Sequence, residues 1–191
     1  MNKHIDITGV VLTTPRLTLR PWKESDLHDF YEYARVDGVG QMAGWKPHCS
    51  LEESEMILKL FMEGRKTFAI EHKGKVIGSL GIEEYRENHY PELDALQGRE
   101  IGYVLSKAYW GQGLMPEAVK TVIQWLFFDQ QLDFIIIGHF DHNSQSRRVI
   151  EKCGFRYNKT IQFETMIETV ENSVEYIQYH PQKSENNPMN T

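Results

Sequence analysis

The chain has 191 residues, 40% of them hydrophobic and 25% charged, which is the composition of a folded protein of one or two domains. Its formal net charge of -6 at pH 7 argues against general nucleic-acid binding through a basic surface. No apolar run approaches the ~20 residues of a membrane span, and no signal peptide is recognisable, so we expect a cytoplasmic protein without membrane contacts.

Hydrophobic periodicity and capping residues predict alternating strands and helices. In chain order, we expect a strand over 16–22, a helix capped by Ser25, a helix over 50–64, strands over 67–72, 76–85 and 100–106, a helix ending near Asp129, a strand over 134–140, a helix over 143–153, and strands around 154–164 and 174–179. This order predicts an α/β (α+β) fold with a mixed sheet. No repeat or linker divides the chain, so residues 10–180 are predicted to form a single domain between flexible termini, 1–9 and 181–191.

Several local signals support these boundaries. Ser50 and Glu53 have the spacing of a capping box, and Asn143 is the expected N-cap of its helix. The dipeptide at 73–74 is typical of a tight hairpin turn. The continuous apolar run over 134–140 indicates a strand that is covered on both faces.

The segment 109–118, YWGQGLMPEA, places a glycine-rich turn between a predicted strand and a predicted helix. Free amides in the first turn of a helix, together with the helix dipole, favour an anion such as a phosphate. Gly111 and Gly113 permit close approach of the backbone and positive φ angles, and Pro116 is tolerated in a first turn. The segment is neither a P-loop nor a GxGxxG motif. Taken alone, it fits an anion site or a tight strand-to-helix turn equally well.

Three motifs follow one another along the chain: TPRLTLRPWKESD near the start, then EIGYVLSKAYWGQGLMPEA, then NSQSRRVIEKCGF. Together they resemble the GNAT superfamily of acetyl-coenzyme A-dependent N-acetyltransferases, and within it the Rim-type branch of ribosomal-protein N-terminal acetyltransferases. The resemblance covers residues 13–180. It implies a mixed, mostly antiparallel central sheet flanked by helices, with a parallel strand pair splayed at the coenzyme site. It also implies an enzyme that uses acetyl-CoA as its cosubstrate.

The resemblance further implies a set of coenzyme-binding residues on the strand, loop and helix of these motifs. They are Val104, Leu105, Trp110, Gly111, Gln112, Gly113, Leu114, Met115, Asn143, Ser146 and Arg148. The strand backbone would meet the pantetheine arm, and the loop amides would meet the pyrophosphate. Arg148, with Arg147 and Lys152, either meets the 3′-phosphate or is an exposed helix cation. Two positions depart from the family pattern: Ala108 replaces a glutamine or arginine, and Ile150 replaces the tyrosine that many relatives use to protonate the leaving thiolate.

Three residues are candidates for proton transfer. Glu100 begins the strand that leads to the acetyl site and matches a glutamate often found there in relatives, so we rank it first as general base, followed by Glu83. Glu84 is interpreted as an ordinary surface carboxylate. Ser146 or a water is expected to protonate the leaving thiolate, which is already a fair leaving group at a pKa of roughly 8.5. A neutral amine can attack the thioester directly, with backbone N–H groups near Leu105 holding the oxyanion.

The acceptor is predicted to be a protein or peptide N-terminal amine. An α-amine with a pKa near ~7.8 loses its proton at neutral pH at a cost of about 1 kcal/mol, against about 4.6 kcal/mol for a lysine. The acidic segments 83–100 and 164–175 either suit a cationic amine or basic peptide, or form a solvated surface. Trp45 and the loop 37–49 either wall the acceptor pocket or belong to the core.

Two alternative functions stay open. One is acetylation of a small molecule such as a polyamine, an amino acid or an antibiotic. The other is a non-catalytic acyl-CoA-binding sensor, which the departures from the family pattern keep open. The family also leaves a homodimer open. No metal site is predicted, because His139 and His142 lack a third ligand at a suitable spacing.

Overall fold

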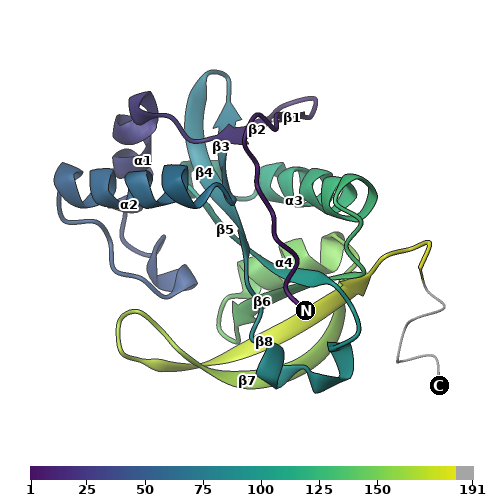
Figure 1. The fold of residues 1–191 in the computed structure, drawn as a ribbon. Coiled ribbons are helices and arrows are strands. Elements are labelled where there is room, and N and C mark those ends of the chain that lie inside the picture. The colour runs from purple at the N-terminus through teal and green to yellow at the C-terminus, as the bar shows by residue number, and fades with distance from the viewer. Residues whose placement is uncertain (184–191) are drawn as a thin grey trace.

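The computed structural model describes residues 1–183, in which eight strands form one sheet (Figure 1). The strands are β1 (Leu12–Thr13), β2 (Thr18–Pro21), β3 (Thr67–His72), β4 (Lys75–Glu83), β5 (Gly98–Leu105), β6 (Phe134–Phe140), β7 (Arg156–Glu164) and β8 (Val170–Tyr179). They follow the order β1-β2-β3-β4-β5-β6-β8-β7, and every neighbouring pair is antiparallel except β5 and β6. The predicted mixed, mostly antiparallel sheet is confirmed.

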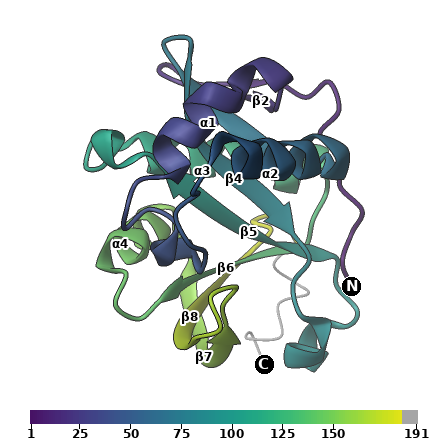
Figure 2. The same cartoon turned by 90° about the vertical axis from the view of Figure 1, so that its left-hand side faces the viewer.

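Helices cover both faces of the sheet. They are α1 (Leu27–Ala34), α2 (Leu51–Gly64), α3 (Leu114–Gln124), which continues into a π-helix (Trp125–Asp129), and α4 (Ser144–Lys152). Figures 1 and 2 show α1 and α2 together on one face and α3 on the other. Side chains of β3 alternate between two cores, with Ile70 in the core of α3 and α4 and Ala69 in the core of α1 and α2. Within the described part of the chain, no helix is long and apolar enough to cross a membrane.

Side-chain caps fix the start of two helices. The Asn143 carboxamide oxygen accepts a hydrogen bond from the Ser146 N–H (3.0 Å), and the Ser50 hydroxyl accepts one from the Glu53 N–H (3.2 Å). Both predicted caps are therefore confirmed. The Glu53 carboxylate does not close a capping box, because it accepts a hydrogen bond from the Cys49 N–H instead (2.6 Å).

Strand β6 has the predicted bounds and is covered on both faces. Ile135 and Ile137 pack in the core of α3 and α4, whereas Phe134 and Ile136 pack in a third cluster on the opposite face. The hairpin turn predicted at 73–74 is also present, with φ angles of 52° and 79°.

One helix boundary differs from the prediction. Ser25 does not cap α1: it lies within a short 3₁₀ turn, and α1 begins at Leu27. The Asp26 carboxylate organises this turn by accepting a hydrogen bond from the Lys23 N–H (2.8 Å). The helix predicted to end near residue 129 does end there, although its hydrogen bonding changes from α to π at Trp125. Hydrophobic spacing reports which residues face the core, but it does not resolve the hydrogen-bond register at helix ends.

The N-terminal segment, expected to be flexible over residues 1–9, packs against the domain. Ile5 and Ile7 are buried in the core of α3 and α4. Their spacing of two residues places both side chains on one side of an extended chain, a signal too short to stand out from the polar residues around it. At the other end, residues 184–191 of the tail expected to be flexible lie outside the described residues.

The parallel strands β5 and β6 pair over only four residues, from Gly98 opposite Phe134 to Ile101 opposite Ile137. Beyond these residues, β5 pairs only with β4 and β6 only with β8 within the described chain. One edge of each strand is therefore left without a strand partner, and the sheet opens at its centre. This is the splayed pair that the family resemblance implied.

Candidate active site

A cavity of about 470 Å³ lies where β5 and β6 separate. Residues on both faces of β5 line it: Ile101 and Tyr103 on one face, Glu100 and Val104 on the other. The first turn of α3, the exposed side of α4 and the loop 39–43 complete the wall. The cavity is therefore lined by side chains from both faces of β5.

The glycine-rich turn that enters α3 has an open, preformed geometry. Gly111 and Gly113 both adopt positive φ angles, 75° and 74°. Gly113 is the N-cap residue of α3, and no side chain caps the helix, so the first-turn amides are available to a ligand. A β-carbon at Gly111 would meet no atom within 4 Å. This end of α3 therefore has the geometry that binds an anion through backbone N–H groups.

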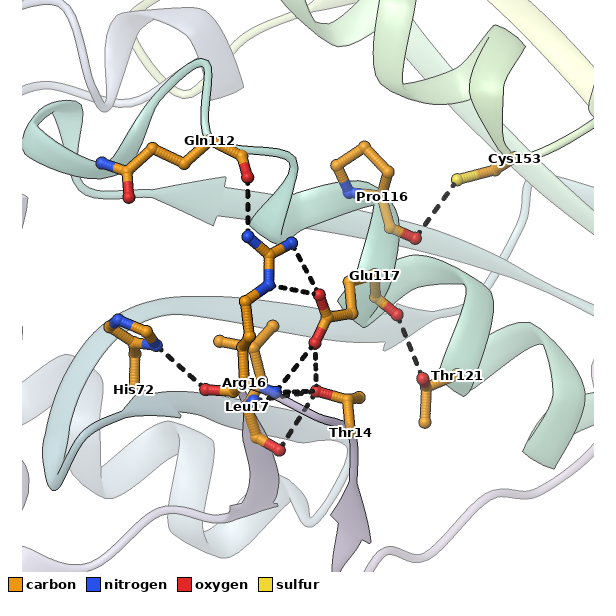
Figure 3. Close-up of polar contacts among 9 residues, drawn as sticks. All are labelled: Thr14, Arg16, Leu17, His72, Gln112, Pro116, Glu117, Thr121 and Cys153. Atoms are coloured by element: carbon orange, nitrogen blue, oxygen red, sulfur yellow. Dashed lines mark hydrogen bonds and ion pairs between the residues drawn. The ribbon is translucent and has the colours of Figure 1, made fainter.

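Arg16, from the loop before β2, braces this turn (Figure 3). Its guanidinium donates to the Gln112 carbonyl (Nη1, 2.9 Å) and to the Glu117 carboxylate on α3 (Nε, 2.7 Å). The Thr14 hydroxyl donates to the same carboxylate. Burial acts to raise the pKa of Glu117, but the hydrogen bonds from Thr14 and Arg16 outweigh it and lower that pKa. The motif at the start of the chain is thus physically linked to the glycine-rich turn.

Two carboxylates face each other across β4 and β5 but have different surroundings. Glu83 and Glu100 are directly opposite in the register. Lys66 pairs with Glu83, which does not line the cavity, whereas Glu100 does line it. Burial raises the pKa of Glu100 to about 7, the charge of Arg86 opposes this shift, and the charge of Glu83 adds to it. Glu100 is therefore the carboxylate placed to exchange a proton near neutral pH.

Glu84 has no comparable setting. Its side chain is 71% exposed, and it lies 3.5 Å from the guanidinium of Arg99. The interpretation of Glu84 as a surface carboxylate agrees with this position.

The loop 37–49 contributes to the cavity through small and apolar residues rather than through its tryptophan. Val39, Met42 and Ala43 line the wall. Trp45 instead packs against His48, with ring centres 5.1 Å apart, beside the core of α1 and α2. Of the two interpretations of Trp45, the structure supports the core position.

Comparison with known protein families identifies the domain. A family model described as "Acetyltransferase (GNAT) domain" matches residues 16–156, which is most of the chain. The chain belongs to the GNAT acetyltransferase family.

Two curated proteins with N-acetyltransferase names are similar to this GNAT chain. "Probable N-acetyltransferase YjcK" of Bacillus subtilis is 46% identical over 61 residues, which cover 32% of this chain and 34% of that protein. "Uncharacterized N-acetyltransferase p20" of Bacillus licheniformis is 28% identical over 153 residues, which cover 76% of this chain and 82% of that protein. The matched region thus spans about a third of YjcK and most of p20. The family and these names support the expected enzyme class, an acetyl-CoA-dependent N-acetyltransferase.

Solved structures share the same fold. A GNAT acetyltransferase from Bacillus anthracis has a TM-score of 0.76 at 21% identity, covering 90% of this chain and 99% of that one. A putative ribosomal-protein-serine acetyltransferase from Vibrio cholerae has a TM-score of 0.74 at 17% identity, covering 92% and 99%. The microcin C7 self-immunity acetyltransferase MccE, solved with acetyl-CoA and AMP, has a TM-score of 0.72 at 17% identity, covering 87% and 93%. At these identities the likeness establishes the fold alone.

Ten of the eleven residues expected to hold acetyl-CoA line the cavity of this GNAT domain. The exception is Gln112, whose side-chain amide donates to the Ala108 carbonyl (3.1 Å). On α4, Arg148 and Lys152 line the cavity, whereas Arg147 pairs with a glutamate on its own helix. The open first turn of α3 and these two cations fit the anionic phosphates of a coenzyme.

A tyrosine that sequence spacing did not reveal lies beside the predicted proton donor. Tyr103 lines the cavity, and its hydroxyl oxygen is 2.8 Å from the Ser146 hydroxyl oxygen. Burial raises the pKa of Tyr103, so its hydroxyl stays protonated at neutral pH. Ile150, at the position of the usual GNAT tyrosine, is fully buried in the core. The contact joins β5 to α4, which are separated in sequence, so no local pattern could have predicted it.

Proposed function

We propose that this chain transfers the acetyl group of acetyl-CoA to a protein or peptide N-terminal amine, the reaction of the Rim-type branch. The observation that carries the proposal is Glu100: a half-buried carboxyl with a pKa of about 7, in the wall of a cavity that also includes the open N-terminus of α3. An α-amine has a pKa of about 7.7–8.0, so a base with a pKa near 7 is well matched to it.

Different residues of the chain carry out proton transfer and coenzyme binding. Acetyl-CoA supplies the thioester that is attacked. Glu100 accepts the proton of the acceptor amine, directly or through a water. The Tyr103–Ser146 pair returns a proton to the leaving sulfur, and the braced turn and Arg148 hold the phosphates. The Leu105 carbonyl already accepts a hydrogen bond from the Trp110 indole (2.8 Å), which fixes the end of β5 against the turn.

Support for an N-terminal acceptor comes from the motifs and from the fold. The motif TPRLTLRPWKESD resembles the Rim-type branch, and its Arg16 braces the coenzyme turn. A structural relative is named a putative ribosomal-protein-serine acetyltransferase. The carboxylates of the acidic segment 83–100, which includes Glu100, favour an acceptor amine that arrives as a cation.

The test is release of free coenzyme A, measured with a thiol-reactive dye. Acetyl-CoA is offered with peptides that have free N-termini, with polyamines, and with aminoglycosides. We expect turnover with the peptides and a loss of about 10²-fold or more in Glu100→Gln. Glu84→Gln is the matched control, because it removes an exposed carboxylate nearby, and it should keep full activity.

Other outcomes of this assay separate the alternatives. Turnover with polyamines or aminoglycosides alone would assign a small-molecule acceptor. Tight coenzyme binding by calorimetry without thiol release from any amine would favour a sensor. If acetyl-CoA does not bind, the assignment of the turn at 109–118 as its phosphate site is wrong.

A further inference from the structure

A buried carboxylate lies on β8, two strands away from Glu100, and one of its oxygens has no hydrogen-bond partner among the described residues. It belongs to Glu175, which is only 6% exposed, and the oxygen is Oε2. Folded proteins pair nearly all buried carboxylates, because an unpaired buried charge is expensive. The surroundings of Glu175 are therefore incomplete in the protein alone.

The strand register places Glu175 on the same face of the sheet as Glu100. Glu100 is opposite Ile136, and Gly138, two residues further along β6, is directly opposite Glu175. Residues opposite each other, or two apart on a strand, point to the same face. The two carboxylates thus lie on the same face of the sheet.

Glu175 does not itself line the cavity, but it lies next to residues that do. Its strand neighbours Gly138 and Ser173 both line the cavity wall. A β-carbon on Gly138 would lie 2.9 Å from the Ser173 hydroxyl and 3.7 Å from Cγ of Glu175. The glycine therefore leaves room for the Ser173 hydroxyl, and the stem of Glu175 lies at ordinary contact distance beside it.

The cations near Glu175 do not neutralise it. Lys159 is opposite Glu175 in the register, but its ammonium donates to the His89 carbonyl and lies 3.4 Å from the centre of the Tyr90 ring. Arg86 stacks over Phe163, 5.0 Å from the ring centre; its charge acts to lower the pKa of Glu175, but burial outweighs it, and Oε2 of Glu175 has no hydrogen-bond partner among the described residues. The coenzyme is an unsuitable partner as well, because its phosphates are anionic.

We propose that Glu175 forms a second acceptor subsite, which binds an ammonium or guanidinium group on the acceptor while Glu100 receives the amine that is acetylated. This inference rests on the proposed function and narrows its substrate class to acceptors with a second cationic group. Two sources share this chemistry: a basic side chain close to a peptide N-terminus, and the second amine of a diamine.

The experiment compares acceptors that differ only in the second cation. One arm uses a serine–lysine peptide amide and its serine–norleucine isostere, and the other uses 1,4-diaminobutane and butylamine. Glu175→Gln is isosteric and removes only the charge. We expect its kcat/KM to fall about 30-fold or more for the cationic member of the preferred pair, since loss of one partner of a buried charge pair costs that much. The neutral member should change by less than about twofold.

The controls distinguish a subsite from a structural role. Glu164→Gln removes an exposed carboxylate from the neighbouring strand β7 and should leave both members unchanged. Equal losses for the cationic and neutral members in Glu175→Gln would overturn the subsite, and so would a wild-type enzyme that does not prefer the cation in either arm.

A binding measurement keeps this inference separate from the proposed function. The peptide and the diamine are titrated by calorimetry into protein saturated with coenzyme A. Weaker binding of these ligands in Glu175→Gln supports the subsite. If no acceptor is acetylated in the same experiment, the proposed function is wrong but the subsite is not. Turnover with every amine and no dependence on the second cation would overturn the subsite and leave the proposed function standing.

Discussion

The coenzyme side and the acceptor side of the cavity differ in how their polar groups are satisfied. On the coenzyme side, Arg16 ties the glycine-rich turn to Glu117, and the charged groups of this brace are already paired. On the acceptor side, Glu100 is half-buried and Glu175 is buried; burial raises the pKa of each to about 7 against the opposing charge of Arg86, and Oε2 of Glu175 has no hydrogen-bond partner among the described residues. The cosubstrate is the same throughout the family, so its phosphate site can be formed by backbone groups that are already held in place before it binds. In the proposed reaction, an acceptor that carries its own cation would meet these carboxylates.

The largest effect should come from the pH dependence of the acceptor side. Glu100 accepts a proton only when ionised, so with a pKa of about 7 its contribution grows as pH rises through 7. We expect the ratio of kcat/KM between the wild type and Glu100→Gln to climb between pH 6 and 8 and to level off at ~10² or more. The acceptor amine ionises identically in both reactions, so the ratio isolates Glu100. A ratio that is flat with pH would remove Glu100 from the role of base.

Removing the contacts of Arg16 with the glycine-rich turn and Glu117 should weaken the binding of acetyl-CoA and leave the acceptor side unchanged. In Arg16→Ala or Glu117→Gln, we expect the KM for acetyl-CoA to rise about tenfold with kcat unchanged, since hydrogen bonds to charged groups contribute ~1.5–3 kcal/mol. S-acetylpantetheine lacks the pyrophosphate and should react equally well with wild type and variants. Lys75→Ala, which breaks the exposed pair with Glu32, is the control. Equal losses with both acetyl donors would show that the brace supports the fold rather than the phosphate site.

Removing the buried hydroxyls at the thiolate end should have a smaller effect. Tyr103→Phe is expected to lower kcat by less than about tenfold, because a thiol with a pKa of roughly 8.5 leaves readily without help. The double variant with Ser146→Ala should lose no more than the worse single variant, because the two hydroxyls act as one unit. Fully additive losses in single-turnover rates would contradict a shared proton path.

The smallest effect should appear in stability and should reveal the unpaired carboxylate directly. The pKa of Glu175 rises from 4.5 to about 7 on folding, so the folded state favours its protonated form and loses stability as pH rises through 7. Glu175→Gln cannot ionise. We expect it to melt roughly 2–8 °C above wild type at pH 8 but close to wild type at pH 5, for a gain of ~1–2 kcal/mol. A variant that is less stable at both pH values would mean that the carboxylate has a partner.

The parts of this molecule that sequence could predict are those with local causes. The apolar run of β6, the Asn143 cap and the positive-φ glycines of the turn each follow from residues close together in the chain. The wider resemblance added the splayed strands, which no single segment specifies. Glu100 could be predicted as a candidate base because it lies near the start of β5, the strand that carries part of the family motif.

The remaining features depend on how distant segments meet. Glu83 pairs with Lys66 and does not line the cavity. Arg16 contacts Glu117, which lies about a hundred residues further along the chain. In the sequence, Glu175 is one of several glutamates in an acidic segment. Its burial follows from the pairing of β6 with β8, which the sequence pattern does not show. Pairing and burial of this kind are properties of the assembled sheet, and hydrophobic periodicity carries no information about them.

The four-residue ladder between β5 and β6 has a consequence for how long the protein survives. Pantetheine carries amide groups, and the facing edges of the two strands have backbone groups free to meet them, as a peptide strand would when it joins a sheet. A ligand that binds only the folded state stabilises it by mass action, by about 2.7 kcal/mol at a hundred times its Kd. We therefore expect saturating acetyl-CoA to slow the unfolding and proteolysis of this protein.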